Sequence, residues 1–117
     1  MNIAVIGSRT FEDYRKLEHT LDTIIEERKL TDITIVSGGA RGADTLAEKY
    51  ARNRGYALIV KDADWDRYGK RAGYLRNVEM AEIADMCVGF VVNDSPGSTM
   101  MLKLCADRGI EAIAIRS

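Results

Sequence analysis

The chain has 117 residues, of which 46% are hydrophobic and 30% charged, a composition typical of one soluble domain with a hydrophobic core. Seventeen basic residues meet eighteen acidic ones, for a net charge of -1, which disfavours a protein whose main role is to coat nucleic acid. No apolar run approaches the ~20 residues that span a bilayer, and one histidine with two cysteines is a poor ligand set for zinc. We therefore expect a single cytoplasmic domain over residues 1–117, with no membrane segment, metal or other cofactor.

Short β-rich runs alternate with longer helical patterns along the chain. Strands are predicted at Ile3–Ile6, Ile33–Val36, Ala57–Val60, Cys87–Val92 and Ala112–Ile115. Their residues are almost all apolar rather than alternating, as in parallel strands that are buried on both faces. Cys87 in the fourth strand and Cys105 in the last helix are expected to be reduced thiols of the core.

Helical periodicity fills the gaps between these strands. Helices are predicted from about Tyr14 to Ile25, from Gly42 or Ala43 to Gly55, from Lys70 to Ala84 and from Ser98 to Arg108. This alternation favours a doubly wound sheet with right-handed crossovers. We predict an α/β fold, a Rossmann-like three-layer α/β/α sandwich around a five-stranded, mainly parallel sheet in the order 3-2-1-4-5.

Ligands of such sheets bind at the carboxyl ends of the strands, near the point where the strand order reverses. The loops after strands one, two and four should therefore carry the chemistry. The first is Gly7-Ser8-Arg9-Thr10. Its glycine permits a sharp turn, its hydroxyls can donate hydrogen bonds, and its guanidinium is a planar fork suited to phosphate.

The second loop, Ser37-Gly38-Gly39-Ala40-Arg41-Gly42-Ala43-Asp44, has three glycines in five positions. Between a strand and a helix, such a loop leaves backbone N–H groups free to surround an anion, and the helix N-terminus adds positive charge. It lacks the Lys-Ser/Thr pair of a Walker loop, and a tight turn that only packs the helix on the sheet is the alternative. Asp44 either caps the helix, which is the simpler interpretation, or binds a ligand hydroxyl.

The third loop, Asn93-Asp94-Ser95-Pro96-Gly97-Ser98-Thr99, also joins a buried strand to a helix. Ser98 and Thr99 are suited either to cap this helix or to donate to a phosphate. Alone this loop indicates no more than a capped helix. Three such loops at one edge of a sheet favour a phosphate-binding site.

A long polar segment follows strand three and holds the only tryptophan. Trp65 and Tyr68 are candidates for stacking on a base, and Arg76 for binding a phosphate. The alternative for Trp65 is that it plugs one side of the core. Asp62, Asp64 and Asp66 lack the rest of an EF-hand pattern, so no metal site is expected there.

Five groups of residues extend in order over nearly the whole chain: Gly7-Ser8-Arg9, Ser37 to Asp44, Ala63-Asp64-Trp65 with Tyr68-Gly69, Ala72-Gly73 with Arg76-Asn77 and Met80, and Ser95-Pro96-Gly97-Ser98-Thr99. Together they resemble the YspA-type branch of the SLOG superfamily. Its Rossmann-like domains include LOG-type nucleotide phosphoribohydrolases, the DNA-processing protein DprA, and ligand sensors of bacterial and phage conflict systems. The resemblance implies homodimerisation and a nucleotide pocket lined by Gly7, Ser8, Arg9, Gly38, Gly39, Arg41, Gly42, Asp44, Arg76, Gly97, Ser98 and Thr99.

Three functions remain open at this stage. The first is binding or sensing of a nucleotide-derived small molecule, such as an ADP-ribose or NAD-related compound. The second is LOG-like cleavage of an N-glycosidic bond; the glutamate that follows the LOG glycine motif is absent here, so Asp44, Asp64 and Asp94 are the candidate catalytic residues. The third and least favoured is DprA-like binding of single-stranded nucleic acid. The sequence is compatible both with an enzyme and with a protein that only binds its ligand.

Overall fold

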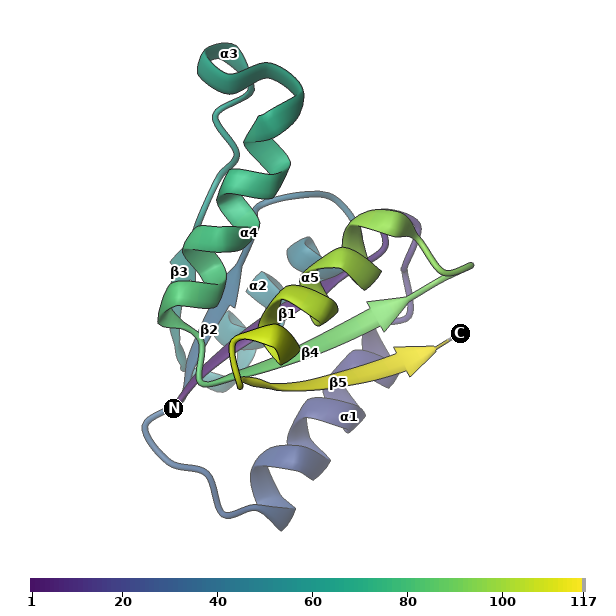
Figure 1. The fold of residues 1–117 in the computed structure, drawn as a ribbon. Coiled ribbons are helices and arrows are strands. Elements are labelled where there is room, and N and C mark those ends of the chain that lie inside the picture. The colour runs from purple at the N-terminus through teal and green to yellow at the C-terminus, as the bar shows by residue number, and fades with distance from the viewer. Residues whose placement is uncertain (117) are drawn as a thin grey trace.

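The computed structural model describes residues 1–116 and contains one sheet of five strands in the order β3-β2-β1-β4-β5 (Figure 1). The strands are β1 (Asn2–Gly7), β2 (Thr34–Ser37), β3 (Ala57–Val60), β4 (Met86–Val91) and β5 (Glu111–Arg116). Every pairing in the sheet is parallel. The Rossmann-like fold and the predicted strand order are therefore confirmed.

Four long helices lie where the periodicity predicts them. They are α1 (Tyr14–Glu27), α2 (Ala43–Arg54), α4 (Ala72–Ile83) and α5 (Pro96–Asp107). Between β3 and α4 the chain also forms a short helix, α3 (Trp65–Tyr68), and a 3-10 turn (Gly69–Arg71), where the sequence predicted only a loop. The Asp64 carboxylate caps α3 by accepting a hydrogen bond from the Arg67 N–H at 3.2 Å. Four residues are too few to show a helical period, so this helix was missed.

Two helices cover each face of the sheet. Successive side chains of β1 point to opposite faces, so this strand contributes to the core on both sides of the sheet. Ile3 and Val5 pack in one cluster with residues of α1 and α2. Ala4 and Ile6 pack in the other with residues of α4 and α5. Figure 1 shows α3 and the start of α4 projecting beyond the rest of the domain. This projection places α3 outside the sandwich.

The expectation that all five strands are buried on both faces is wrong for the two edge strands. β4 is buried along its whole length, but Ile59 and Val60 of β3 are 37% and 39% exposed, and β5 is partly exposed. An edge strand has a neighbour on one side only, which its apolar sequence does not reveal. Cys87 and Cys105 are free and fully buried, as expected. Among residues 1–116, no helix is long and apolar enough to cross a membrane.

A polar link ties α1 to α2 beside the core. The ring of Tyr50 is fully buried, and its hydroxyl donates to Asp22 Oδ1 at 2.6 Å. Arg54 donates to the same carboxylate, with Nη2 and Oδ2 2.6 Å apart. The hydrogen bond from Arg54 holds the pKa of Asp22 below its ordinary value, against the opposing effect of burial.

We expect Tyr50→Phe to lower the free energy of unfolding by about 1 kcal/mol, because one hydrogen bond is lost while the ring stays packed. Urea denaturation measures the change. In the control Tyr14→Phe, the lost hydroxyl only accepts an exposed bond from Asn53, and the change should stay within about 0.5 kcal/mol. Equal stability of both variants would mean that Arg54 alone holds Asp22.

Candidate functional site

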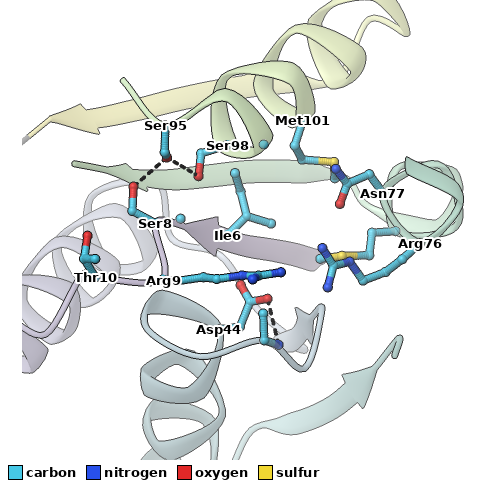
Figure 2. A pocket seen from close by; sticks show the side chains of 14 residues that line it. Ile6, Ser8, Arg9, Thr10, Asp44, Arg76, Asn77, Ser95, Ser98 and Met101 are labelled. Carbon is cyan, nitrogen blue, oxygen red and sulfur yellow. Dashed lines mark hydrogen bonds between the residues drawn. The ribbon is translucent and has the colours of Figure 1, made fainter. Parts of the chain in front are cut away.

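A pocket of about 420 Å³ opens at the carboxyl end of the sheet, between β1 and β4, where the strand order reverses (Figure 2). Its volume is typical of small-molecule sites. We call it the switch-point pocket; it is lined by Ile6, Gly7, Ser8, Arg9, Thr10, Ala40, Asp44, Arg76, Asn77, Met80, Ser95, Gly97, Ser98 and Met101. The three predicted loops meet here, together with one face of α4.

Ser8 joins the three loops that form the pocket. Its N–H donates to the Phe90 carbonyl oxygen of β4 at 3.0 Å, and its own carbonyl accepts from the Ala43 N–H at 3.4 Å. Its Oγ accepts from the Val92 N–H at 2.8 Å and lies 2.6 Å from Ser95 Oγ. Ser8 is therefore engaged in holding the loops together rather than free to bind a ligand.

The hydroxyl chain beyond Ser8 does offer a donor. Ser95 Oγ donates to Ser98 Oγ at 3.1 Å at the first turn of α5 (Figure 2), so the Ser98 hydroxyl can itself donate to a group in the pocket. Ser95, not Ser98 or Thr99, occupies the N-cap position of α5, and its side chain makes no capping hydrogen bond. The N–H groups of this first turn thus add positive potential beside the pocket.

Gly42 makes the contact between the first and second loops sterically feasible. Its φ of 78° and ψ of -127° are accessible essentially to glycine alone. A Cβ atom here would overlap the Ser8 carbonyl oxygen and lie 2.7 Å from Arg9 Cα. The glycine is required where the two loops touch.

Two arginines face each other across the pocket. Figure 2 shows the side chains of Arg9 and Arg76 extending toward one another from opposite sides, with Asp44 beside them. Arg76 Nη1 donates to the Gly38 carbonyl oxygen at 3.1 Å, whereas its Nε is buried without a partner. Within residues 1–116, neither arginine takes part in an ion pair. Both guanidinium groups remain available to an anion.

Asp44 is the buried acid of the pocket, only 5% exposed. Its Oδ2 accepts a hydrogen bond from the Ala40 N–H at 3.2 Å, so Asp44 stabilises the glycine loop. The simpler interpretation, that Asp44 caps α2, is therefore wrong. Burial raises the pKa of Asp44 from 3.8 to about 6, although the Ala40 N–H and the charge of Arg76 oppose this rise. A carboxyl group poised this near neutrality is a common feature of functional sites.

The glycine loop is less open than predicted. The Gly39 N–H donates to Ser37 Oγ at 3.1 Å, and the Ala40 N–H is bound to Asp44. Ser37 Oγ in turn donates to Glu48 Oε2 at 2.8 Å. Two of the amides expected to surround an anion are therefore already engaged within the loop.

Four lining residues, Ile6, Asn77, Met80 and Met101, are not among the predicted site residues. Ile6, Met80 and Met101 form the apolar part of the lining, and Asn77, 7% exposed, adds a buried amide. A signal was present, because Asn77 lies three residues before Met80 and hence on the same face of a helix. A buried amide in the middle of a helix is unusual unless something binds it.

A second, adjoining pocket of about 340 Å³ lies on the β3 side. We call it the side pocket; it is lined by Arg9, Gly38, Gly39, Ala40, Arg41, Asp62, Ala63, Trp65 and Arg76. Arg9, Ala40 and Arg76 are common to both pockets. Trp65 is 49% exposed, so the interpretation of this residue as a plug of the core is wrong.

The remaining predicted site residues lie outside the two pockets. Thr99 donates from Oγ1 to the carbonyl oxygens of Ser95 and Pro96, and Tyr68 lines neither pocket. Asp94 is ion-paired with Arg116 at the surface, and Asp64 caps α3. Of the three candidate catalytic acids, only Asp44 lies in the switch-point pocket. The described residues 1–116 contain no group of three His, Cys, Asp or Glu side chains that could hold a metal ion.

A parallel sheet with a pocket at its switch point defines a Rossmann-like α/β domain. Residues 1–68 match the model of the YspA, cpYpsA-related SLOG family (YAcAr). The Gene 61 protein of Mycobacterium phage D29 is 34% identical over 119 residues, which cover 95% of this chain and 93% of the phage protein. The chain belongs to this SLOG family.

A solved structure gives independent support for the fold. The X-ray structure of DNA processing protein A (DprA) from Streptococcus pneumoniae matches with a TM-score of 0.79 at 20% sequence identity. The match covers 99% of this chain and 50% of that chain. The present chain thus spans about half the length of that protein, and at this identity the likeness concerns the fold.

We expect Asp44→Asn to raise the free energy of unfolding above pH 6. The pKa of Asp44 rises from 3.8 to about 6 on folding, and each pKa unit corresponds to about 1.4 kcal/mol, so the gain is about 3 kcal/mol at most. The folded-state pKa is raised, so the buried carboxylate destabilises the fold at neutral pH, and wild type regains stability as the pH falls from about 6 to 3.8. The amide oxygen of asparagine can still accept from Ala40. Thermal unfolding of both proteins at pH 8 and pH 4 measures the difference, and a gap of the same size at both would contradict it.

Proposed function

We propose that the switch-point pocket binds the phosphate of a nucleotide-derived small molecule between Arg9 and Arg76. The observation that carries this proposal is the convergence of two guanidinium groups on one pocket, neither of them ion-paired to any residue from 1 to 116. Guanidinium forks bind phosphate oxygens in pairs and with strong, charge-assisted hydrogen bonds. The N-terminal turn of α5 supplies further N–H groups at the same pocket.

The rest of the pocket suits the nucleoside part of such a ligand. Met80 and Met101 provide an adaptable apolar surface for a ring. The Asn77 amide and the Ser98 hydroxyl provide donors and acceptors for the edge of that ring or for ribose. Membership of the SLOG family favours a nucleotide-related ligand. ADP-ribose and NAD-related compounds are the ligand class we propose.

Binding is tested by thermal shift and calorimetry with AMP, ADP, ATP, NAD and ADP-ribose. A ligand at about 100 times its dissociation constant should stabilise the fold by roughly 2.7 kcal/mol, a shift of several degrees at this size.

We expect Arg9→Ala and Arg76→Ala each to weaken binding by about 1.5–3 kcal/mol, because each removes a charged hydrogen bond to phosphate. Calorimetry with the ligand that gives the largest shift measures the loss. Arg52→Ala is the matched control, since Arg52 is exposed on α2 and lines neither pocket. No shift with any of the five compounds, or equal affinity of all three variants, would overturn the proposal.

Cleavage of an N-glycosidic bond is the second candidate function, and the buried Asp44 favours it. A carboxyl group with a pKa of about 6 is suited to accept a proton from water while the water oxygen adds to the anomeric carbon and the C–N bond breaks, its electron pair leaving with the base. Asp44 then passes the proton to the departing adenine of AMP, or to solvent when neutral nicotinamide leaves NAD. Incubation with AMP and NAD, followed by chromatography, should then yield free base, and Asp44→Asn should abolish the product. Recovery of intact nucleotide at the rate without protein would leave binding as the function.

Two further proposals concern partners. The structural likeness to a DNA processing protein makes binding of single-stranded DNA an alternative function that needs a direct test. Because the net charge is -1, we expect a gel-shift titration at low salt to show no binding.

We also propose that the protein forms a homodimer, as the family resemblance implies. Light scattering after gel filtration should then give twice the 13.0 kDa of one chain.

A further inference from the structure

The side pocket is a second compartment beside the proposed phosphate site. Arg9, Ala40 and Arg76 line both pockets, so a phosphate held between the two arginines lies at the boundary of the two. Arg41 adds a third guanidinium on the side-pocket side and, among residues 1–116, forms no ion pair. The two adjoining pockets thus hold three guanidinium groups, more than are needed to bind a single monophosphate.

Trp65 gives the side pocket an aromatic wall. It is the only tryptophan of the chain, it begins α3, and 49% of it is exposed although the domain has a well-formed core. An exposed indole that lines a pocket presents a face on which a base can stack. Asp62 lines the same pocket and adds a carboxylate that can accept hydrogen bonds from ribose hydroxyls or a base amino group.

Gly73 explains how Trp65 is held in this position. Gly73 is the second residue of α4 and carries no side chain on the surface of its first turn. A Cβ atom at this position would approach Trp65 Cη2 to 3.3 Å. The missing side chain therefore lets the indole lie directly against α4, at the wall that also carries Arg76. Together with the α3 cap by Asp64, this contact orients the ring.

We infer that the ligand is a dinucleotide: one nucleoside lies in the switch-point pocket, the bridging diphosphate at the arginines, and the second ring in the side pocket against Trp65. This inference rests on the proposed function and narrows its ligand class. A mononucleotide would fill only the first compartment. A dinucleotide would use both compartments and all three guanidinium groups.

The experiment compares NAD with ADP and uses Trp65 as a built-in reporter. Because the chain has no other tryptophan, its emission reports on the side pocket alone. NAD should change the emission saturably, with the same midpoint as in calorimetry, while ADP binds with little change. A parallel titration of N-acetyltryptophanamide corrects for absorption by the nucleotides.

Variants separate the two compartments. Trp65→Ala should reduce the affinity for NAD about tenfold, the effect of one lost stacking contact, and leave that for ADP unchanged. Gly73→Ala should shift the indole slightly, because the added Cβ would lie 3.3 Å from Trp65 Cη2, and should weaken NAD binding less than Trp65→Ala does. Tyr74→Ala is the control, because Tyr74 is exposed on α4 and lines neither pocket.

The outcomes distinguish failure of the dinucleotide inference from failure of the proposed phosphate site. If ADP and NAD bind equally tightly, or if Trp65→Ala leaves their ratio unchanged, the side pocket takes no second ring, and only the mononucleotide site stands. If neither compound binds by calorimetry, the phosphate site and the dinucleotide inference both fail. A stronger effect of Trp65→Ala on NAD than on ADP supports the inference.

Discussion

The site depends on the contacts of Ser8 at the end of β1. Its backbone binds β4 and the first residue of α2, and its hydroxyl binds the loop after β4. Parallel strands bring loops from distant parts of the sequence to one edge, but adjacency alone does not fix their relative positions. Hydrogen bonds from one buried residue do so here, and Phe11, packed on Phe90 with ring centroids 5.1 Å apart, anchors the other end of the Arg9 loop.

Several features at the carboxyl ends of the strands, around the switch-point pocket, lower the stability of the folded state. Gly42 has a backbone conformation open essentially to glycine alone, Asp44 carries a carboxyl group into a buried position, and Arg76 Nε lacks a partner. None of these features is needed to build a parallel sheet. The two core clusters consist of hydrophobic residues, so these unfavourable groups gather at the pocket, as is typical of a site that binds or transforms a ligand.

Much of the fold was predictable because its determinants are local. Apolar runs with helical patterns between them identify β1 to β5 and the four long helices, and the reversal of strand order follows from the Rossmann-like arrangement. For the site, the sequence predicted which loops form it but not the contacts that their side chains make. That Asp44 bonds Ala40, that Asp94 pairs with Arg116, and that Trp65 lies on Gly73 depend on distances between segments. The exposure of β3 likewise follows from its place at the edge, which its apolar residues do not disclose.

The position of Asp44 beside the arginines makes the pocket a binding site for protons as well. A negative charge placed near this carboxylate raises its pKa further above the value of about 6. By thermodynamic linkage, an anionic ligand then arrives together with a proton taken from solvent, and acidification strengthens its hold. Occupancy of the domain would follow the acidity of its surroundings together with the ligand concentration, without any movement of the chain.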